Sequence, residues 1–270
     1  MKLNKNNYFN DEANRHYMSV SQFKSFLPQY GGCEAAAMAK INGEYQPGPV
    51  EAFDEGHFVH AWNEGTLEEF KANNPHIYSS RGKTAGELKS NFKHCEKMIE
   101  TLANDPWVMK ALTGQKEIIM TTELFGIPWK VMLDSYNPGG GYFSDIKTMR
   151  EMEGKFWNKS AQVYENFIDH YGYNLQMAIY AEVEKQVSGR KDWLLPHMVI
   201  VTKQDPPDHE IIYFDYDAIE QGLYIVGNYI ERVKAVKSGN EKPNRCGKCE
   251  YCRATKQIDR IKHYSELALY

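Results

Sequence analysis

The sequence lacks long apolar runs and an excess of positive charge. Nowhere in its 270 residues does a run approach the roughly 18 apolar residues of a membrane span. The first residues, Met1 to Asn6, also lack the apolar stretch of a signal peptide. The formal net charge of −4 argues against a protein that coats nucleic acid without specificity, although a local groove can still be basic. We therefore expect a cytoplasmic protein with no membrane partner.

Cysteine is also scarce, with five residues in the whole chain. An odd number of cysteines without an export signal does not suggest a disulfide framework, so metal binding or buried thiols explain them better. The apolar fraction of 42% is sufficient for a real core. The length suits one large domain, or one domain with an appendage.

Helical patterns fill the first part of the chain and strand patterns follow. A first helix begins near the N-cap Ser19, and further helices are predicted at 34–40, 50–64, 85–104, 162–186 and 216–237. Strands are predicted at 117–125, 129–134, 142–148, 198–202 and 210–214, with a loop at 154–160. This order predicts a mixed α/β (α+β) fold. We expect a single domain with a helical part (1–110), a core (111–237) and a cysteine-rich tail (238–270).

Two acids and a lysine lie on the predicted hairpin between the second and third strands. Asp134 ends one apolar run, and Asp145 and Lys147 share one face of the next strand. If the hairpin closes near Gly139 and Gly140, opposed residues have numbers that sum to about 279, so Asp134 faces Asp145. Two carboxylates this close repel unless a cation lies between them, and a hard divalent cation is the usual solution. Lys147 can then orient or deprotonate a water that attacks phosphorus.

A simpler interpretation of the hairpin stays open. Asp134 can be a turn residue at a strand end, and Asp145 and Lys147 can form a solvated ion pair. The remaining motifs favour the catalytic interpretation.

Two further pairs of residues lie one helical turn apart. Gln176 and Tyr180 share a helix face and can bind a phosphate backbone, although a half-buried tyrosine beside a solvated glutamine is the commoner arrangement. Gly56 and His60 have the same spacing. A lone histidine is usually structural, but His60 can complete a metal site made by two acids.

Three cysteines of the tail, Cys246, Cys249 and Cys252, recur every third residue and can surround one compact centre. A [4Fe-4S] cluster or a closed zinc site needs a fourth thiolate. Cys33 is predicted in a loop and can reach the centre, whereas Cys95 lies on the apolar stripe of a predicted helix and fits the core. The tight spacing favours an iron–sulfur cluster, with Zn²⁺ as the alternative.

Together these residues resemble the PD-(D/E)XK nuclease superfamily in its RecB-type branch. That branch has GxxxH, an aspartate that ends a strand, D-x-K on the next strand and QxxxY on the following helix. The chain has these motifs in the same order, at Gly56 to His60, Asp134, Asp145 to Lys147 and Gln176 to Tyr180.

The iron–sulfur members of the branch, such as CRISPR-associated adaptation nucleases and AddB-type helicase-nucleases, add S-x-S before one cysteine and three cysteines near the end. Here Ser19 and Ser21 precede Cys33, and the tail carries the other three. The resemblance covers residues 19–252 and is strongest to phage and prophage proteins similar to the RecE exonuclease.

The resemblance implies a restriction-endonuclease-like core, with a central mixed sheet flanked by helices, and a Mg²⁺- or Mn²⁺-dependent DNA exonuclease. Such an enzyme would act in a bacterium or phage-infected cell, in recombination beside a single-strand annealing protein. The implied metal ligands are His60, Asp134, Asp145 and the carbonyl of Ile146. Lys147 would position the attacking water, Gln176 and Tyr180 would contact DNA, and either Glu117 or Glu123 would add a carboxylate.

Other classes of function remain as alternatives. The chain can be a noncatalytic nucleic-acid-binding protein with a nuclease fold and a structural metal centre, or a structural metalloprotein whose acids are surface charge. The intact set of Asp134, Asp145 and Lys147 favours the enzyme. Relatives act as rings or monomers, so a homo-oligomer is possible in principle. The candidates for a basic DNA groove are Lys83, Lys89, Lys93, Arg150, Lys155 and Lys159.

Overall fold

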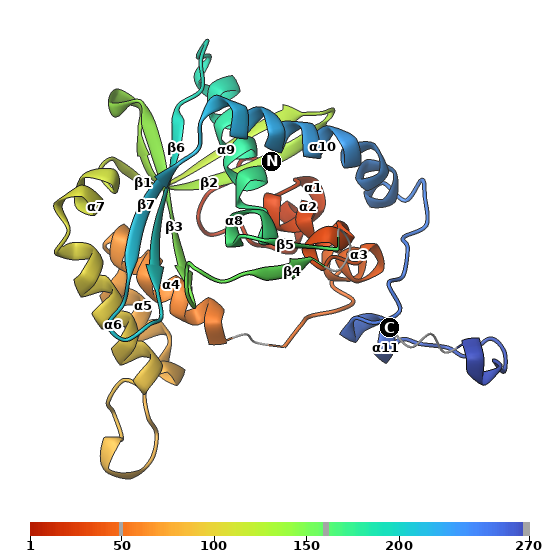
Figure 1. The fold of residues 1–270 in the computed structure, drawn as a ribbon, viewed down its shortest axis with the longest axis horizontal. Coiled ribbons are helices and arrows are strands. Elements are labelled where there is room, and N and C mark those ends of the chain that lie inside the picture. The colour runs from red at the N-terminus through yellow and green to blue at the C-terminus, as the bar shows by residue number, and fades with distance from the viewer. Residues whose placement is uncertain (49–50, 159–161, 267–270) are drawn as a thin grey trace.

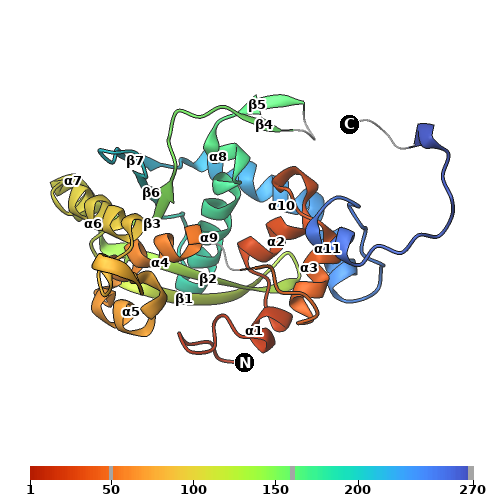
Figure 2. The same cartoon turned by 90° about the horizontal axis from the view of Figure 1, so that it is seen from below.

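The computed structural model is built around a five-stranded mixed sheet with the strand order β1-β2-β3-β6-β7 (Figure 1). It describes residues 1–48, 51–158 and 162–266. Strands β3 and β6 are parallel, and the other neighbouring pairs are antiparallel. A separate pair, β4 and β5, lies away from this sheet (Figure 2). The strands are β1 (Gln115–Leu124), β2 (Ile127–Asn137), β3 (Tyr142–Met149), β4 (Phe156–Asn158), β5 (Val163–Glu165), β6 (Leu195–Thr202) and β7 (His209–Tyr213).

Helices cover both faces of the sheet. Helices α9 and α10 pack on one face, and α4, α6 and α7 pack on the other. The helices are α1 (Asp11–His16), α2 (Val20–Phe26), α3 (Glu34–Ile41), α4 (Glu51–Glu64), α5 (Leu67–Asn73), α6 (Ser90–Ala103), α7 (Pro106–Ala111), α8 (Phe167–His170), α9 (Tyr173–Ser188), α10 (Tyr216–Lys237) and α11 (Glu250–Ala254). This arrangement confirms the expected fold class.

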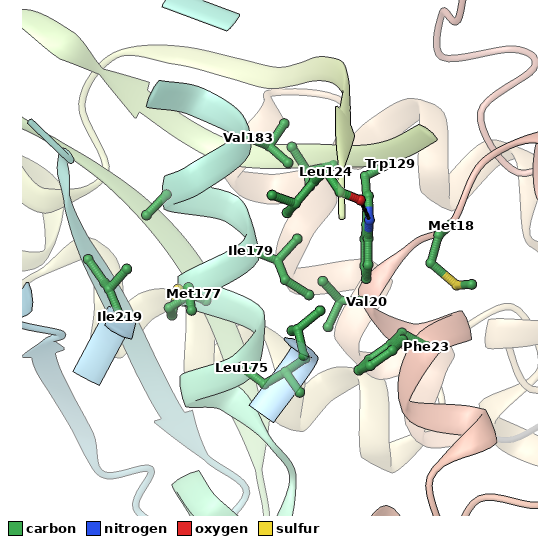
Figure 3. Close-up of a cluster of buried hydrophobic side chains, with 14 of the residues drawn as sticks. Met18, Val20, Phe23, Leu124, Trp129, Leu175, Met177, Ile179, Val183 and Ile219 are labelled. Atoms are coloured by element: carbon green, nitrogen blue, oxygen red, sulfur yellow. Dashed lines mark hydrogen bonds between the residues drawn. The ribbon is translucent and has the colours of Figure 1, made fainter. Parts of the chain in front are cut away.

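The larger core joins the N-terminal helices to the sheet through Trp129. Its indole is fully buried, donates a hydrogen bond to the Leu124 carbonyl (2.9 Å) and lies 5.6 Å from the Phe23 ring. Figure 3 shows this indole between Val20 and Phe23 of α2 and the apolar side chains of α9. Because α2 is fixed against the sheet in this way, the N-terminal segment becomes one wall of the cleft described below.

A second core lies on the opposite face of the sheet. It joins Phe58 and Val59 of α4 to Phe92 of α6 and to Ile146 and Val199 of the sheet. Helix α4 is thereby fixed against β3, which places the polar side of α4 beside the acidic residues of the hairpin.

Most of the predicted elements are present, with three differences. The predicted loop at 154–160 contains strand β4, and the predicted helix at 162–186 is divided into β5, α8 and α9. The division occurs because Asn166 caps α8 and Gly172, in the left-handed conformation (φ 62°), separates α8 from α9. The helix predicted from residue 85 begins at Ser90. Val50, the expected first residue of α4, and residues 159–161 lie outside the described residues.

The cysteine-rich tail packs against the N-terminal helices. Helix α11 of the tail packs against α3 (Figure 2). The Arg232 guanidinium forms two hydrogen bonds with Glu34, of 3.0 and 2.7 Å, and the Asn244 amide donates to the same carboxylate (2.6 Å). These contacts hold the linker of the tail against the start of α3.

Within the described ranges, no helix is both long enough and apolar enough to cross a membrane.

The close approach of α9 and α10 provides a test of the fold. A Cβ added at Gly222 would lie 2.5 Å from the Ala178 Cβ, whereas one added at Gly227 would find its nearest neighbour, the Phe125 ring, at 3.9 Å. We expect Gly222→Ala to lower the free energy of unfolding by about 1 to 3 kcal/mol through overpacking. Gly227→Ala on the same helix should raise it by up to about 1 kcal/mol through helix propensity. Urea denaturation measures both, and equal shifts would contradict the tight contact.

Candidate active site

The hairpin has the predicted register, but its two strands separate at the acids. Ser135 pairs with Ser144 and Tyr136 with Phe143, so the numbers of opposed residues do sum to 279 (135 + 144). The ladder runs from the turn only to Ser135 and Ser144, so Asp134 and Asp145 lie one step beyond its last pair. The predicted register is therefore confirmed, but the regular pairing ends one step before the two acids, whose carboxylates are both buried.

The regular alternation of β2 changes at the same position. Leu133 belongs to the large core with α9, yet Ser135, two residues later, hydrogen-bonds Asn63 of α4. On β1, Lys116 pairs with Ser135 and Ile118 pairs with Leu133, which leaves Glu117 opposite Asp134 between them. Glu117 has a positive φ of 54°, which is unusual for a residue with a side chain and marks local strain.

Asp134 is the centre of a group of three ligand atoms. Its Oδ2 lies 3.3 Å from His60 Nδ1 and accepts a hydrogen bond from the Ile146 amide (2.7 Å). Ligand atoms of His60, Glu117 and Asp134 lie within 4.8 Å of one another. One imidazole nitrogen and two carboxylate oxygens are a suitable donor set for a divalent cation such as Mg²⁺ or Mn²⁺. These residues therefore fit the predicted kind of metal.

Of the two glutamates that the sequence offered for an added carboxylate, Glu117 lies in the site. Glu123 pairs with Pro128 near the other end of β1. The signal was present in the sequence: a hairpin that turns at Gly126 places Glu117 opposite Asp134.

Asp145 has a different set of partners. Its Oδ1 accepts a hydrogen bond from Gln176 Nε2 (2.8 Å), and its Oδ2 forms an ion pair with the Lys147 ammonium (2.5 Å). The Lys147 ammonium also lies 5.5 Å from the centre of the Tyr173 ring. Of the predicted ligands, the structure groups His60 and Asp134 with Glu117, while Asp145 contacts Lys147 and Gln176. Ile146 contributes its amide to Asp134.

The charges of the site shift the pKa values of its members in opposite directions. Burial raises the pKa of Asp145, and the neighbouring Asp134 raises it further, against the effect of Lys147. For Asp134, burial is outweighed by His60, Lys147 and the Ile146 amide, and its pKa is lowered. The two acids raise the pKa of Lys147 although burial alone would lower it. Lys147 is therefore an ammonium ion at neutral pH.

The pKa values of Glu117 and His60 are both raised. Burial, followed by the charge of Asp134, raises the pKa of Glu117 from 4.5 to about 6. Burial lowers the pKa of His60, but the Asp134 carboxylate has the opposite and larger total effect, so that pKa is raised. Both groups must lose their protons before they can bind a metal.

A polar network beneath the site was missed by sequence reasoning. The Asn63 side chain donates to the Asp134 carbonyl (3.2 Å), and its oxygen accepts from the Lys116 ammonium (2.6 Å), which also reaches Ser135 Oγ (3.0 Å). Asn63 lies one turn after His60 on α4, and this spacing is the sequence signal that could have identified it. The network satisfies the backbone carbonyl that the distorted strand exposes.

The site opens into a cleft of about 1260 Å³. Every side chain proposed from the sequence for catalysis or DNA contact lines it: His60, Asp134, Asp145, Lys147, Gln176 and Tyr180. Gln176 and Tyr180 lie one turn apart on α9 as predicted, with Gln176 buried against Asp145. Burial raises the pKa of Tyr180 well above its usual value, so its hydroxyl stays neutral.

The candidates for a basic DNA groove do not line this cleft. Of the six candidate cations, the five described ones lie outside the cleft lining, and Lys159 falls outside the described residues. The lysines that line the cleft are Lys5, Lys24, Lys40, Lys130 and Lys147. Of these five, sequence patterns identified Lys147 alone.

Four cysteines form a second group of ligand atoms. The sulfur atoms of Cys33, Cys246, Cys249 and Cys252 lie within 4.8 Å of one another, and no disulfide joins them. Cys33 Sγ is 3.6 Å from Cys252 Sγ, and the backbone amides of Cys246, Cys249 and Cys252 each point at the sulfur of another member. Amides that point at sulfur stabilise thiolates, so this group can hold a metal.

The cysteine thiols differ in their surroundings. Burial opposes ionisation of Cys246, but the amides of Cys249 and Lys248 outweigh it and lower its pKa to about 6. Burial and the neighbouring cysteines raise the pKa of Cys249 to about 12. Burial and the Glu55 carboxylate raise the pKa of Cys95 to about 12, and this residue belongs to the second core. Cys33 rather than Cys95 joins the tail cysteines, as the sequence indicated.

Comparisons with known proteins agree with this geometry. The family model described as a PDDEXK-like domain of unknown function (DUF3799) matches residues 19–255. The crystal structure of a candidate exonuclease from Eubacterium rectale is similar over 100% of this chain and 99% of that chain, with 36% identity and a TM-score of 0.91. The alignment with the crystal structure of SSO0001 covers 86% of this chain and 93% of that chain, at 12% identity and with a low TM-score of 0.29. None of the curated proteins compared with the chain matches it.

The fold and the site define a member of the PD-(D/E)XK nuclease superfamily. Within that superfamily, the chain belongs to the PDDEXK-like DUF3799 family.

The raised pKa of Glu117 predicts a gain in stability when its charge is removed. A pKa of about 6 in the folded protein, against 4.5 for the unfolded chain, means that folding opposes the charged form. Glu117→Gln should therefore stabilise the metal-free protein at neutral pH by on the order of 1 to 2 kcal/mol. The gain should disappear below pH 4.5, where the parent carboxyl is also protonated. Denaturant unfolding at both pH values tests this, and a loss of stability at neutral pH would contradict the assigned burial of charge.

Proposed function

We propose that this chain is a divalent-metal-dependent nuclease that hydrolyses DNA phosphodiester bonds. The observation that carries the proposal is the convergence of His60, Glu117 and Asp134 within 4.8 Å, beside the Asp145 and Lys147 pair, in one cleft. A metal group, a cationic side chain and space for a polymer are the parts that phosphodiester hydrolysis requires.

In this proposal His60, Glu117 and Asp134 would hold Mg²⁺ or Mn²⁺. Asp145 would add negative charge beside this group and pair with Lys147. The bound cation supplies positive charge to the phosphate and makes a nearby water more acidic. The Ile146 amide donates to the Asp134 carboxylate, and Asn63 donates to the Asp134 backbone carbonyl. The first contact orients the carboxylate and the second fixes the backbone that carries it.

Lys147 positions the attacking water. Its raised pKa keeps it protonated, so it donates hydrogen bonds to the water and to the phosphate oxygens and does not act as the base. Asp145 aims the ammonium, and Gln176 fixes Asp145 in turn. The proposed role of Gln176 is therefore to orient this pair, while Tyr180 offers its neutral hydroxyl to the DNA strand.

We favour action from a DNA end. The similar chain from Eubacterium rectale, which covers this chain completely, is itself named a candidate exonuclease. The similarity to that protein supports exonuclease activity for the present chain. We propose that the present chain acts in DNA recombination beside a single-strand annealing protein.

The cysteine group forms a metal-dependent clasp between the chain ends. The close CxxCxxC spacing favours a [4Fe-4S] cluster. Zn²⁺ is a second candidate with a specific observation in its favour. Sulfur separations of 3.6 and 3.9 Å are close to the roughly 3.8 Å that a tetrahedral Zn–S distance of about 2.3 Å requires.

The nuclease is tested with a linear duplex labelled at one end and a circular duplex of the same sequence. We expect the parent to degrade the linear DNA with Mg²⁺ or Mn²⁺ and to leave the circle intact. Lys147→Ala and Asp134→Asn should each lower the rate by about a hundredfold or more, because each removes a charge from the reacting centre.

Lys93→Ala is the matched control, since this lysine pairs with Glu87 outside the cleft lining and its loss should not change the rate. Cleavage by Lys147→Ala at the parent rate would show that the site is assigned wrongly. Absence of cleavage by folded parent protein with either metal would favour the noncatalytic nucleic-acid binder.

The clasp is tested by comparing two cysteines. Cys33→Ser should remove most of the tightly bound metal, measured by elemental analysis of anaerobically purified protein, and should lower the melting temperature. Cys95→Ser should also lower the melting temperature, because it places a hydroxyl in the second core, but it should keep the metal. Visible absorbance with bound iron identifies the cluster, whereas colourless protein with zinc identifies the zinc site. Equal metal content in both variants would contradict the clasp.

A further inference from the structure

One face of α4 runs from the candidate active site to the mouth of the cleft. Phe53, His57 and His60 lie at successive turns of this helix and all line the cleft. His60 is the candidate metal ligand, and Phe53 lies seven residues earlier, about 10 Å away along the helix axis. The Phe53 side chain is largely solvent-exposed, with 65% of its surface accessible.

A second exposed aromatic ring lines the same cleft from another part of the chain. Phe9, in the N-terminal segment, is 70% exposed. Its ring packs edge-on against the buried Tyr8, with centroids 4.8 Å apart, and the Lys130 ammonium lies 4.6 Å from the Tyr8 ring centre. The Phe9 ring therefore has one fixed neighbour, Tyr8, while most of its surface faces solvent. A single exposed aromatic residue is ordinary, but two that line one cleft are a better sign of a binding function.

Lysines line the same cleft. Lys40 is exposed at the end of α3, and the Lys24 ammonium donates to the Tyr171 carbonyl (2.8 Å) and lies 5.6 Å from the Tyr173 ring centre. Lys147 approaches the same ring. The lining also holds five carboxylates, three of which belong to the candidate active site. Aromatic platforms and lysines that line one groove are features that bind single-stranded nucleic acid.

We propose that Phe53 and Phe9 stack on unpaired bases of a single-stranded DNA end, while the lysines of the cleft contact its phosphates. The proposal deepens the proposed nuclease function, because it identifies the form of DNA that enters the cleft. Within a duplex each base is paired and stacked on both sides, and only the outer face of the terminal pair is free, so two rings can stack on successive bases only where the end is unpaired. The cleft therefore selects a frayed or overhanging end.

The binding experiment separates stacking from general affinity. Fluorescence anisotropy in the presence of EDTA, which prevents cleavage, measures the affinity of the full chain for a short oligothymidylate and for an oligomer of the same length with abasic sites. Phe53→Ala should weaken binding of the oligothymidylate by about fivefold or more, which is the lower range for the loss of one stacked base. It should leave the affinity for the abasic oligomer unchanged.

Two controls accompany this measurement. Trp107→Ala removes a ring of similar exposure (72%) on α7, outside the cleft lining, and should change neither affinity. Phe53→Tyr keeps an aromatic face and should restore binding to the parent value, whereas Phe53→Leu keeps only an apolar side chain and should not. Unchanged melting temperatures confirm that the variants fold.

The outcomes for stacking and for nuclease activity are distinguishable. Equal weakening on both oligomers, no weakening by Phe53→Ala, or no binding by the parent would overturn the stacking proposal, even if the parent cleaves DNA. Base-dependent binding by a parent that does not cleave DNA would support stacking while the proposed catalytic function fails. Cleavage of a duplex with a single-stranded overhang, slowed in Phe53→Ala but not in Trp107→Ala, would support both.

Discussion

The electrostatic balance around Asp134 is the constraint on which the site depends. Glu117, Asp134 and Asp145 come from three adjacent strands and lie at nearly the same level of the sheet. Three carboxylates in a buried region repel one another. His60, Lys147 and the Ile146 amide compensate part of this repulsion, which is why the pKa of Asp134 is lowered while those of Glu117 and Asp145 are raised. The remaining negative charge makes this group suitable for a divalent cation.

The sheet is irregular at the level of these three carboxylates. The β2–β3 ladder ends at Ser135, the side-chain alternation of β2 changes beside Asp134, and Glu117 has a left-handed backbone. Such strain persists only where the surroundings enforce it. Here the two cores fix the strands on both sides of the distortion, and the buried Trp129 holds β2 against α2 and α9.

The sequence contained the local features of this site but not all of its partners. The positions of Asp134, Asp145 and Lys147 followed from turn chemistry and the two-residue period of strands, which are short-range rules. The spacing of Asn63 one turn after His60 was a local signal, but the role of Lys116 depends on how α4 packs on the sheet. The cleft lysines other than Lys147 were missed because their positions also depend on tertiary packing, and the division near Gly172 was missed because the helical period continues on both sides of it.

The four cysteines connect distant parts of the chain. Cys33 and Cys246, whose amide points at the Cys33 sulfur, are 213 residues apart in the sequence. Their sulfur atoms can meet only after the sheet between them has been made. Helix α3, which begins after Cys33, carries Lys40 and Ile41 of the cleft wall. The sulfur atoms can therefore hold this wall only after the rest of the fold has brought the four cysteines together.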